Sequence, residues 1–171
     1  MVLHRLHPME RLLFNIHINA PRRSVGSVLW DGPSVARWTE SIRPGVRVVS
    51  DRQIGSRVHF LSGEKDGIYA IIDRKEEPAY MGFTHFGAVV DGHELPVDED
   101  QCEWSGAREA YALVDNLGGT DLLVMLDIDD VEVSDFTQLV RSSLRIVKVL
   151  AERERAPFFA YDQASFLRPV H

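Results

Sequence analysis

Apolar and polar residues alternate along residues 12–19, whose sequence is L-L-F-N-I-H-I-N. This period of two is typical of a strand with one buried face, and Pro21 ends it. Beyond the proline, apolar residues recur at helical spacing, and Pro33 suits the first turn of a second short helix that ends at Trp38. The pattern therefore predicts a strand followed by two short helices.

The middle of the chain contains four segments that are rich in β-branched and aromatic residues, which predicts four more strands. They are residues 46–50, 57–61, 67–74 and 79–87. Residues 88–104 are acidic and interrupted by Gly and Pro, so we expect a long surface loop there. Residues 107–115 and 120–129 flank the sequence N-L-G-G, a strong hairpin signal, and form the last two predicted strands.

A long amphipathic helix is predicted over residues 134–153, because apolar residues recur there at spacings of three and four. Ser134 is the expected N-cap. Strands joined by short turns pair antiparallel, and a sheet with one apolar face must bury that face against another element. We therefore expect an α+β fold in which a curved seven-stranded antiparallel sheet wraps around the long C-terminal helix.

The length of 171 residues and the hydrophobic content of 44% fit one domain over residues 1–171. Its core is expected over about residues 11–153. Residues 154–171 keep several aromatic side chains but show no clear period. This tail packs either on the domain itself or on a partner, and the sequence does not distinguish the two.

Composition narrows the range of partners. The chain has 19 Lys and Arg against 26 Asp and Glu, a formal charge of −7, and no basic run, which argues against nucleic acid or an anionic membrane surface as the main partner. Cys102 is the only cysteine, so no intramolecular disulfide can form. We find no apolar segment long enough for membrane insertion and no secretory leader, and we expect a cytoplasmic protein.

Three polar residues are expected to face the apolar interior. If the strands pair in register across the turns, Glu109 and Tyr111 share a face with Val124, and His85 shares a face with Phe83. A buried carboxylate must be paired, protonated or near water. One interpretation is a purely structural hydrogen bond. The other is a ligand pocket in which Glu109 is a base or acceptor, Tyr111 a donor, and His85 a neighbouring acid or base.

Several segments resemble those of a known superfamily. They are I-H-I-N-A-P at 16–21, D-G-P-S-V-A-R-W at 31–38, F-x-H-x-G at 83–87, W-x-G at 104–106, E-x-Y at 109–111 and G-G-T-x-L-x-V at 118–124. The chain resembles, over residues 11 to about 153, the SRPBCC superfamily of START-like, helix-grip proteins, and most of all the branch related to the activator of a heat-shock chaperone ATPase. The resemblance implies a deep cavity between sheet and C-terminal helix. Across the superfamily this cavity holds lipids, sterols, polyketides and other apolar molecules.

Our first hypothesis is a binding protein that encloses a small, mostly apolar ligand in this cavity. The expected lining is Trp38, Ile68, Phe83, His85, Glu109, Tyr111, Val124, Phe136 and Val140. We expect no cofactor and no metal, because the histidines are scattered and none has metal-site spacing.

Two alternatives remain. The first is a co-chaperone-like interaction module or homodimer that uses the tail or an outer apolar patch at Leu123 and Met125. The second is a cyclase- or dehydratase-like enzyme in which Glu109 and His85 exchange a proton. No nucleophile elbow or phosphate loop in the sequence supports a different chemistry.

Overall fold

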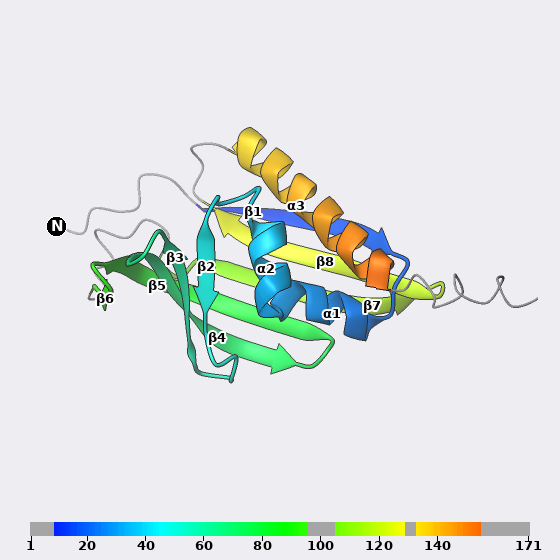
Figure 1. Ribbon diagram of the computed structural model, residues 1–171, viewed down its shortest axis with the longest axis horizontal. Coiled ribbons are helices and arrows are strands. Elements are labelled where there is room, and N and C mark those ends of the chain that lie inside the picture. The colour runs from blue at the N-terminus through cyan, green and yellow to red at the C-terminus, as the bar shows by residue number, and fades with distance from the viewer. Residues whose placement is uncertain (1–8, 96–104, 129–132, 155–171) are drawn as a thin grey trace, which may run out of the picture.

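The computed structural model describes residues 9–95, 105–128 and 133–154, and its elements follow the predicted order (Figure 1). They are β1 (Glu10–Ile18), α1 (Arg22–Trp30), α2 (Gly32–Thr39), β2 (Val46–Val49), β3 (Arg57–Ser62), β4 (Asp66–Glu76), β5 (Tyr80–Val90), β6 (His93–Glu94), β7 (Arg108–Asn116), β8 (Gly119–Ile128) and α3 (Val133–Glu154). This is the predicted α+β class. Residues 1–8, 96–104, 129–132 and 155–171 lie outside the described residues. They include most of the predicted surface loop and almost all of the predicted tail.

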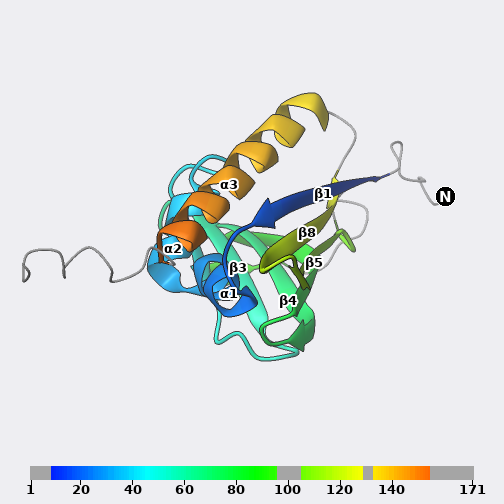
Figure 2. The same ribbon diagram turned by 90° about the vertical axis from the view of Figure 1, so that its right-hand side faces the viewer.

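The sheet is antiparallel throughout. Seven strands lie in the order β1-β8-β7-β5-β4-β3-β2, and the two-residue β6 pairs with the end of β5. Figures 1 and 2 show α3 lying across β1 and β8, with α1 and α2 beside its C-terminal half. The sheet therefore curls around the helices, as expected for strands with a right-handed twist and one apolar face.

The prediction of a loop over residues 88–104 is wrong at its beginning. β5 continues to Val90, and Val90 pairs with His93 across the two-residue turn Asp91-Gly92. Both turn residues have positive φ, 52° and 82°, which is the backbone of the tight turn that a D-G pair favours. The D-G pair is a hairpin signal, but the acidic residues around it suggested a surface loop instead.

The predicted sharing of faces across the hairpins is confirmed. Tyr111 lies opposite Val124, and Ala70 lies opposite His85. The turn between β4 and β5 holds three residues, since Glu76 pairs with Tyr80. A bulge between Ile72 and Arg74 adds one residue to β4. Compared with a four-residue turn and no bulge, either feature alone would place Ala70 and His85 on opposite faces of the sheet. Together they return these two residues to the same face.

The core lies between the inner sheet face and the three helices. On α3, Val140, Leu144 and Val147 are buried as predicted and Ala151 joins them, whereas Leu139 of the predicted face is 40% exposed. Fully buried side chains from β1, α1 and β8 pack against the buried residues of α3. Because this apolar area leaves water on folding, it is the main favourable contribution to stability.

Ser143 is a polar exception in this core and connects α3 to the end of α2. Its hydroxyl is fully buried and donates to the carbonyl oxygen of Trp38 over 2.7 Å. The Ser41 hydroxyl lies 2.6 Å from the Ser143 hydroxyl oxygen and donates to it, because the proton of Ser143 is already used. These two bonds hold the Trp38 end of α2 under α3.

We expect the Ser143→Ala variant to lose about 1–2 kcal/mol of unfolding free energy, because the Trp38 carbonyl and the Ser41 hydroxyl lose their partner in a buried place. Urea unfolding followed by circular dichroism measures this loss. Ser142→Ala is the matched control, since Ser142 is exposed on the same helix. Equal unfolding midpoints for the two variants would contradict the expected role of Ser143.

Candidate functional site

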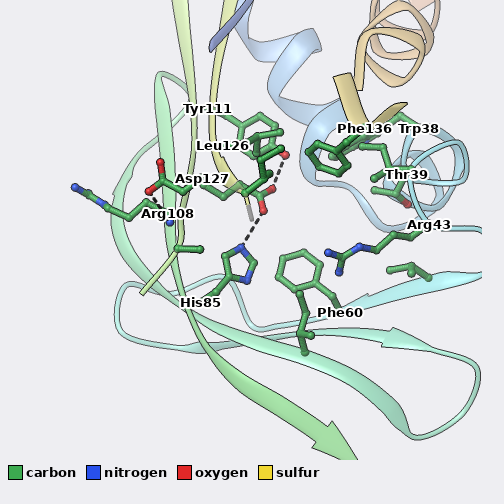
Figure 3. Close-up of a pocket in the computed structure, with 16 residues that line it drawn as sticks. Trp38, Thr39, Arg43, Phe60, His85, Arg108, Tyr111, Leu126, Asp127 and Phe136 are labelled. Carbon is green, nitrogen blue, oxygen red and sulfur yellow. Dashed lines mark hydrogen bonds and ion pairs between the residues drawn. The ribbon is translucent and has the colours of Figure 1, made fainter. Parts of the chain in front are cut away.

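Two cavities lie between the inner sheet face and α2, and the larger one also reaches the beginning of α3. The larger has a volume of about 560 Å³ and the smaller about 270 Å³. The side chains that border both are Trp38, Thr39, Val46, Phe60 and Glu109. Figure 3 shows the larger cavity, whose lining is mostly aliphatic and aromatic. A few polar groups converge on an otherwise apolar space, which is the usual composition of a small-molecule site.

Glu109 is the centre of the polar group. One carboxylate oxygen accepts a hydrogen bond from the Tyr111 hydroxyl over 2.5 Å, and the other lies 3.1 Å from Nε2 of His85. The dashed lines in Figure 3 mark both contacts. Glu109 and Tyr111 are two residues apart on β7 and so point to the same face. The predicted trio of Glu109, Tyr111 and His85 is therefore brought together by the pairing of β5 with β7.

The carboxyl group of Glu109 is ionised at neutral pH. Burial raises its pKa, but the hydrogen bond and charge of His85 and the hydrogen bond from Tyr111 lower it, and the pKa ends below the ordinary value. Burial and the adjacent Glu109 charge raise the pKa of Tyr111 well above its ordinary value. Tyr111 is thus a neutral donor and Glu109 an anionic acceptor. Nε2 of His85 then carries a proton and donates it to Glu109.

The other ring nitrogen of His85 finds no hydrogen-bond partner among the described residues. Nδ1 is buried and contacts no donor or acceptor within the part of the chain that the structure describes. The ring lies beside Phe60, with centroids 5.7 Å apart, at the wall of the larger cavity. A buried, unpaired nitrogen costs about 1–3 kcal/mol. A structural role for the trio explains the contacts of Nε2 but not this unpaired atom.

Aromatic rings hold Tyr111 in place. Trp30 packs edge-on against its ring at 5.0 Å, and Trp38 and Phe83 pack at 6.2 and 6.4 Å. Such tilted arrangements are favourable between aromatic rings. The phenol is therefore oriented by packing, and its hydroxyl is directed at Glu109.

The structure places the predicted lining residues in three groups. Those that border the larger cavity are Trp38, Ile68, His85, Glu109, Tyr111 and Phe136. Phe83 borders the smaller cavity. Val124 and Val140 lie in the core, 3% and 2% exposed, and border neither of these two cavities. A contact of Val124 or Val140 with a ligand stays a prediction, as does proton transfer between Glu109 and His85.

Sequence reasoning missed Phe60 and Arg43. Phe60 lies opposite Ile68 across the β3–β4 hairpin, so the alternation that selected Ile68 would also have selected Phe60. Trp30 borders the smaller cavity from the end of α1. Arg43 follows α2 in an irregular segment, where no periodic pattern shows which way a side chain points.

The far side of the larger cavity carries charges that are already paired. Arg11 binds both carboxylate oxygens of Asp127, at 2.7 and 3.1 Å, and the Arg108 amide donates to the same carboxylate. The Arg108 guanidinium faces Asp73 at 3.7 Å. Within residues 9–95, 105–128 and 133–154, no three His, Cys, Asp or Glu side chains are placed to bind a metal ion.

Comparison with solved structures shows what this architecture is. The chain is similar to an uncharacterized protein from Rhizobium leguminosarum (TM-score 0.59, 12% identity, covering 85% of this chain and 96% of that one). It is also similar to the Aha1 dimer from Colwellia psychrerythraea (0.55, 15%, 82% and 92%). A third similar structure is DynU16, a protein in the dynemicin biosynthetic locus (0.57, 18%, 87% and 48%).

The protein has the helix-grip fold of these solved structures. No model of a protein family matches its sequence, and no curated protein matches it. In this helix-grip domain, α3 is the gripped helix, and Phe136 near its beginning borders the larger cavity. None of the helices in the described residues is both long and apolar enough to cross a membrane.

Proposed function

We propose that this helix-grip protein binds a small, mostly apolar molecule in the larger cavity and recognises a polar group on it through Glu109 and His85. The observation that carries the proposal is a cavity of about 560 Å³ bordered by Glu109 and by His85, whose buried Nδ1 has no hydrogen-bond partner among the described residues. The Glu109 side chain is 19% exposed. Each of its oxygens retains a lone pair beyond the bonds to His85 and Tyr111.

The protonation states define the polar group of the ligand. An ionised Glu109 only accepts hydrogen bonds, whereas Nδ1 of His85 accepts in a neutral ring and donates in a protonated one. A hydroxyl or N–H group on the ligand therefore satisfies the Glu109 carboxylate. The remaining contacts come from Phe60, Ile68, Phe136 and their apolar neighbours, whose burial favours an apolar ligand body.

Filling the cavity is expected to abolish this binding. The test uses N-phenyl-1-naphthylamine, a neutral apolar amine that fluoresces when it leaves water. We expect Ile68→Trp to raise its Kd at least about tenfold, because the indole occupies the space that the probe needs. Ile54→Trp is the matched control, since Ile54 is 64% exposed in the segment before β3. Probe affinity that is the same in both variants, or undetectable in the wild type, would contradict the proposal.

A second candidate is an interaction with another protein, and an exposed apolar strip on the outer sheet face favours it. The strip consists of Leu13, Val114 and Leu123, of which Leu13 is 74% exposed. The sequence predicted that Leu123 faces away from the core, and the structure confirms it. Native mass spectrometry of the purified protein separates the candidates. A released small molecule supports ligand binding, whereas a dimer without a ligand supports the interaction module.

A further inference from the structure

Arg43 differs from the other charged residues around the larger cavity because it has no ion-pair or hydrogen-bond partner for its side chain within the described residues. Its backbone N–H donates to the Thr39 carbonyl at the end of α2. Its guanidinium forms no ion pair or hydrogen bond with any residue of 9–95, 105–128 or 133–154, and its side chain is exposed. By contrast, Asp127 is held by Arg11, and Arg108 faces Asp73.

The Arg43 side chain points toward the cavity. Figure 3 shows it extending from the α2 side toward Phe60, across the cavity from Arg108 and Asp127. Arg43 borders the larger cavity but not the smaller one. The charge of Arg43 also acts on the interior of the cavity. After burial and the contacts with His85 and Tyr111, the Arg43 charge is a further cause of the pKa shift of Glu109, and it lowers that pKa. An exposed guanidinium that borders a cavity is a cation at the cavity mouth.

The two ends of the cavity thus differ in charge. The inner end carries the Glu109 carboxylate, which repels an anion, and the mouth carries the Arg43 cation, which attracts one. Between them the lining is apolar and includes Phe60, Ile42 and Phe136. A planar guanidinium matches a carboxylate with two parallel hydrogen bonds. This polarity fits a molecule with an apolar body and one acidic end.

We propose that the ligand is an amphipathic carboxylic acid, whose carboxylate binds Arg43 at the mouth and whose apolar body fills the cavity toward Glu109. This inference rests on the proposed function and adds the chemical class and the orientation of the ligand. It also assigns Arg43, which no sequence pattern indicated, as a specificity residue.

A pair of probes that differ only in charge tests the assignment. cis-Parinaric acid is a fluorescent carboxylic acid with an apolar chain, and its methyl ester is neutral. We expect the wild type to bind the acid at least about tenfold more tightly than the ester, and Arg43→Gln to remove that preference by weakening the acid alone. Added salt should weaken acid binding by the wild type, since the Arg43 contact is exposed.

Two further variants complete the design. Arg43→Lys keeps the charge but not the paired donors, so it should retain part of the preference for the acid. Arg141→Gln removes an exposed arginine from α3 and should leave both affinities unchanged. Equal binding of acid and ester by the wild type, or equal weakening of both by Arg43→Gln, would overturn the inference.

The neutral amine probe separates the two levels of the proposal. If N-phenyl-1-naphthylamine binds the wild type and Arg43→Gln equally, the cavity is intact and the acid–ester comparison reports on Arg43 alone. If that probe and both parinaric probes fail to bind the wild type, the proposed function itself is wrong. Binding of the amine without a preference for the acid overturns only the assignment of Arg43.

Discussion

Glu109→Leu is expected to lower the free energy of unfolding by about 3 kcal/mol at neutral pH, because it leaves two buried donors unpaired. The Tyr111 hydroxyl and Nε2 of His85 both lose the carboxylate that accepts from them. Glu109→Gln keeps the shape and one acceptor oxygen, so its loss should be smaller. Urea unfolding of the three proteins, followed by tryptophan fluorescence, measures both effects.

The same carboxyl group gives the stability a pH dependence whose sign follows from its pKa. The pKa of Glu109 is lower in the folded protein than its ordinary value, because the His85 and Tyr111 contacts outweigh burial. In the acid range the unfolded chain therefore binds more protons at this position than the folded one. The stabilisation is complete above the pKa of the unfolded state and is lost as the pH falls through the folded pKa.

Glu109→Gln should remove this part of the acid destabilisation. Measured from pH 7 to pH 3, its unfolding free energy should fall less steeply than that of the wild type. Other carboxylates contribute to the slope, so the comparison is between variants. Glu64→Gln, at an exposed position in the β3–β4 turn, is the matched control. Parallel curves for the wild type and Glu109→Gln would show that Glu109 is not the ionised partner of His85 and Tyr111.

The second large effect is expected at Gly67, where β4 runs very close to β3. A Cβ atom on this residue would lie 2.9 Å from Cα of Leu61 and inside the contact distance of the Phe60 carbonyl oxygen. These are backbone atoms of the paired strand, so the strands themselves must move apart. We expect Gly67→Ala to cost about 3 kcal/mol of unfolding free energy. It should also weaken binding of the amine probe, because Phe60 borders both cavities.

Gly32→Ala is the control for this experiment. Gly32 begins α2, and a Cβ there meets nothing within 4 Å. Alanine at this position should leave the stability unchanged or raise it by up to about 1 kcal/mol, because alanine is the better helix former. Thermal unfolding of both variants gives the comparison. A Gly67→Ala protein as stable as Gly32→Ala would show that β3 and β4 tolerate a wider separation.

Local patterns in the sequence were enough to predict most elements of this fold and the centre of the site. The alternation along β7 put Glu109 and Tyr111 on one face, and the N-L-G-G turn set the register that places Val124 opposite Tyr111. The spacing of apolar residues predicted the buried face of α3. These features depend on neighbours in sequence or on one tight turn, so they can be predicted without the rest of the molecule.

Only the tertiary structure decided the features that depend on several elements at once. The three-residue turn after Glu76 and the bulge before Arg74 each reverse the alternation of β4 against β5, and His85 shares a face with Ala70 because they cancel. The unpaired Nδ1 of His85 depends on how the ring packs beside Phe60 of another strand. Arg43 stands in an irregular segment, so its direction is set by α2 and the cavity rather than by any period in the sequence. A repeating pattern specifies which face a side chain occupies, but distances between side chains from different elements are set by the packing of the whole domain.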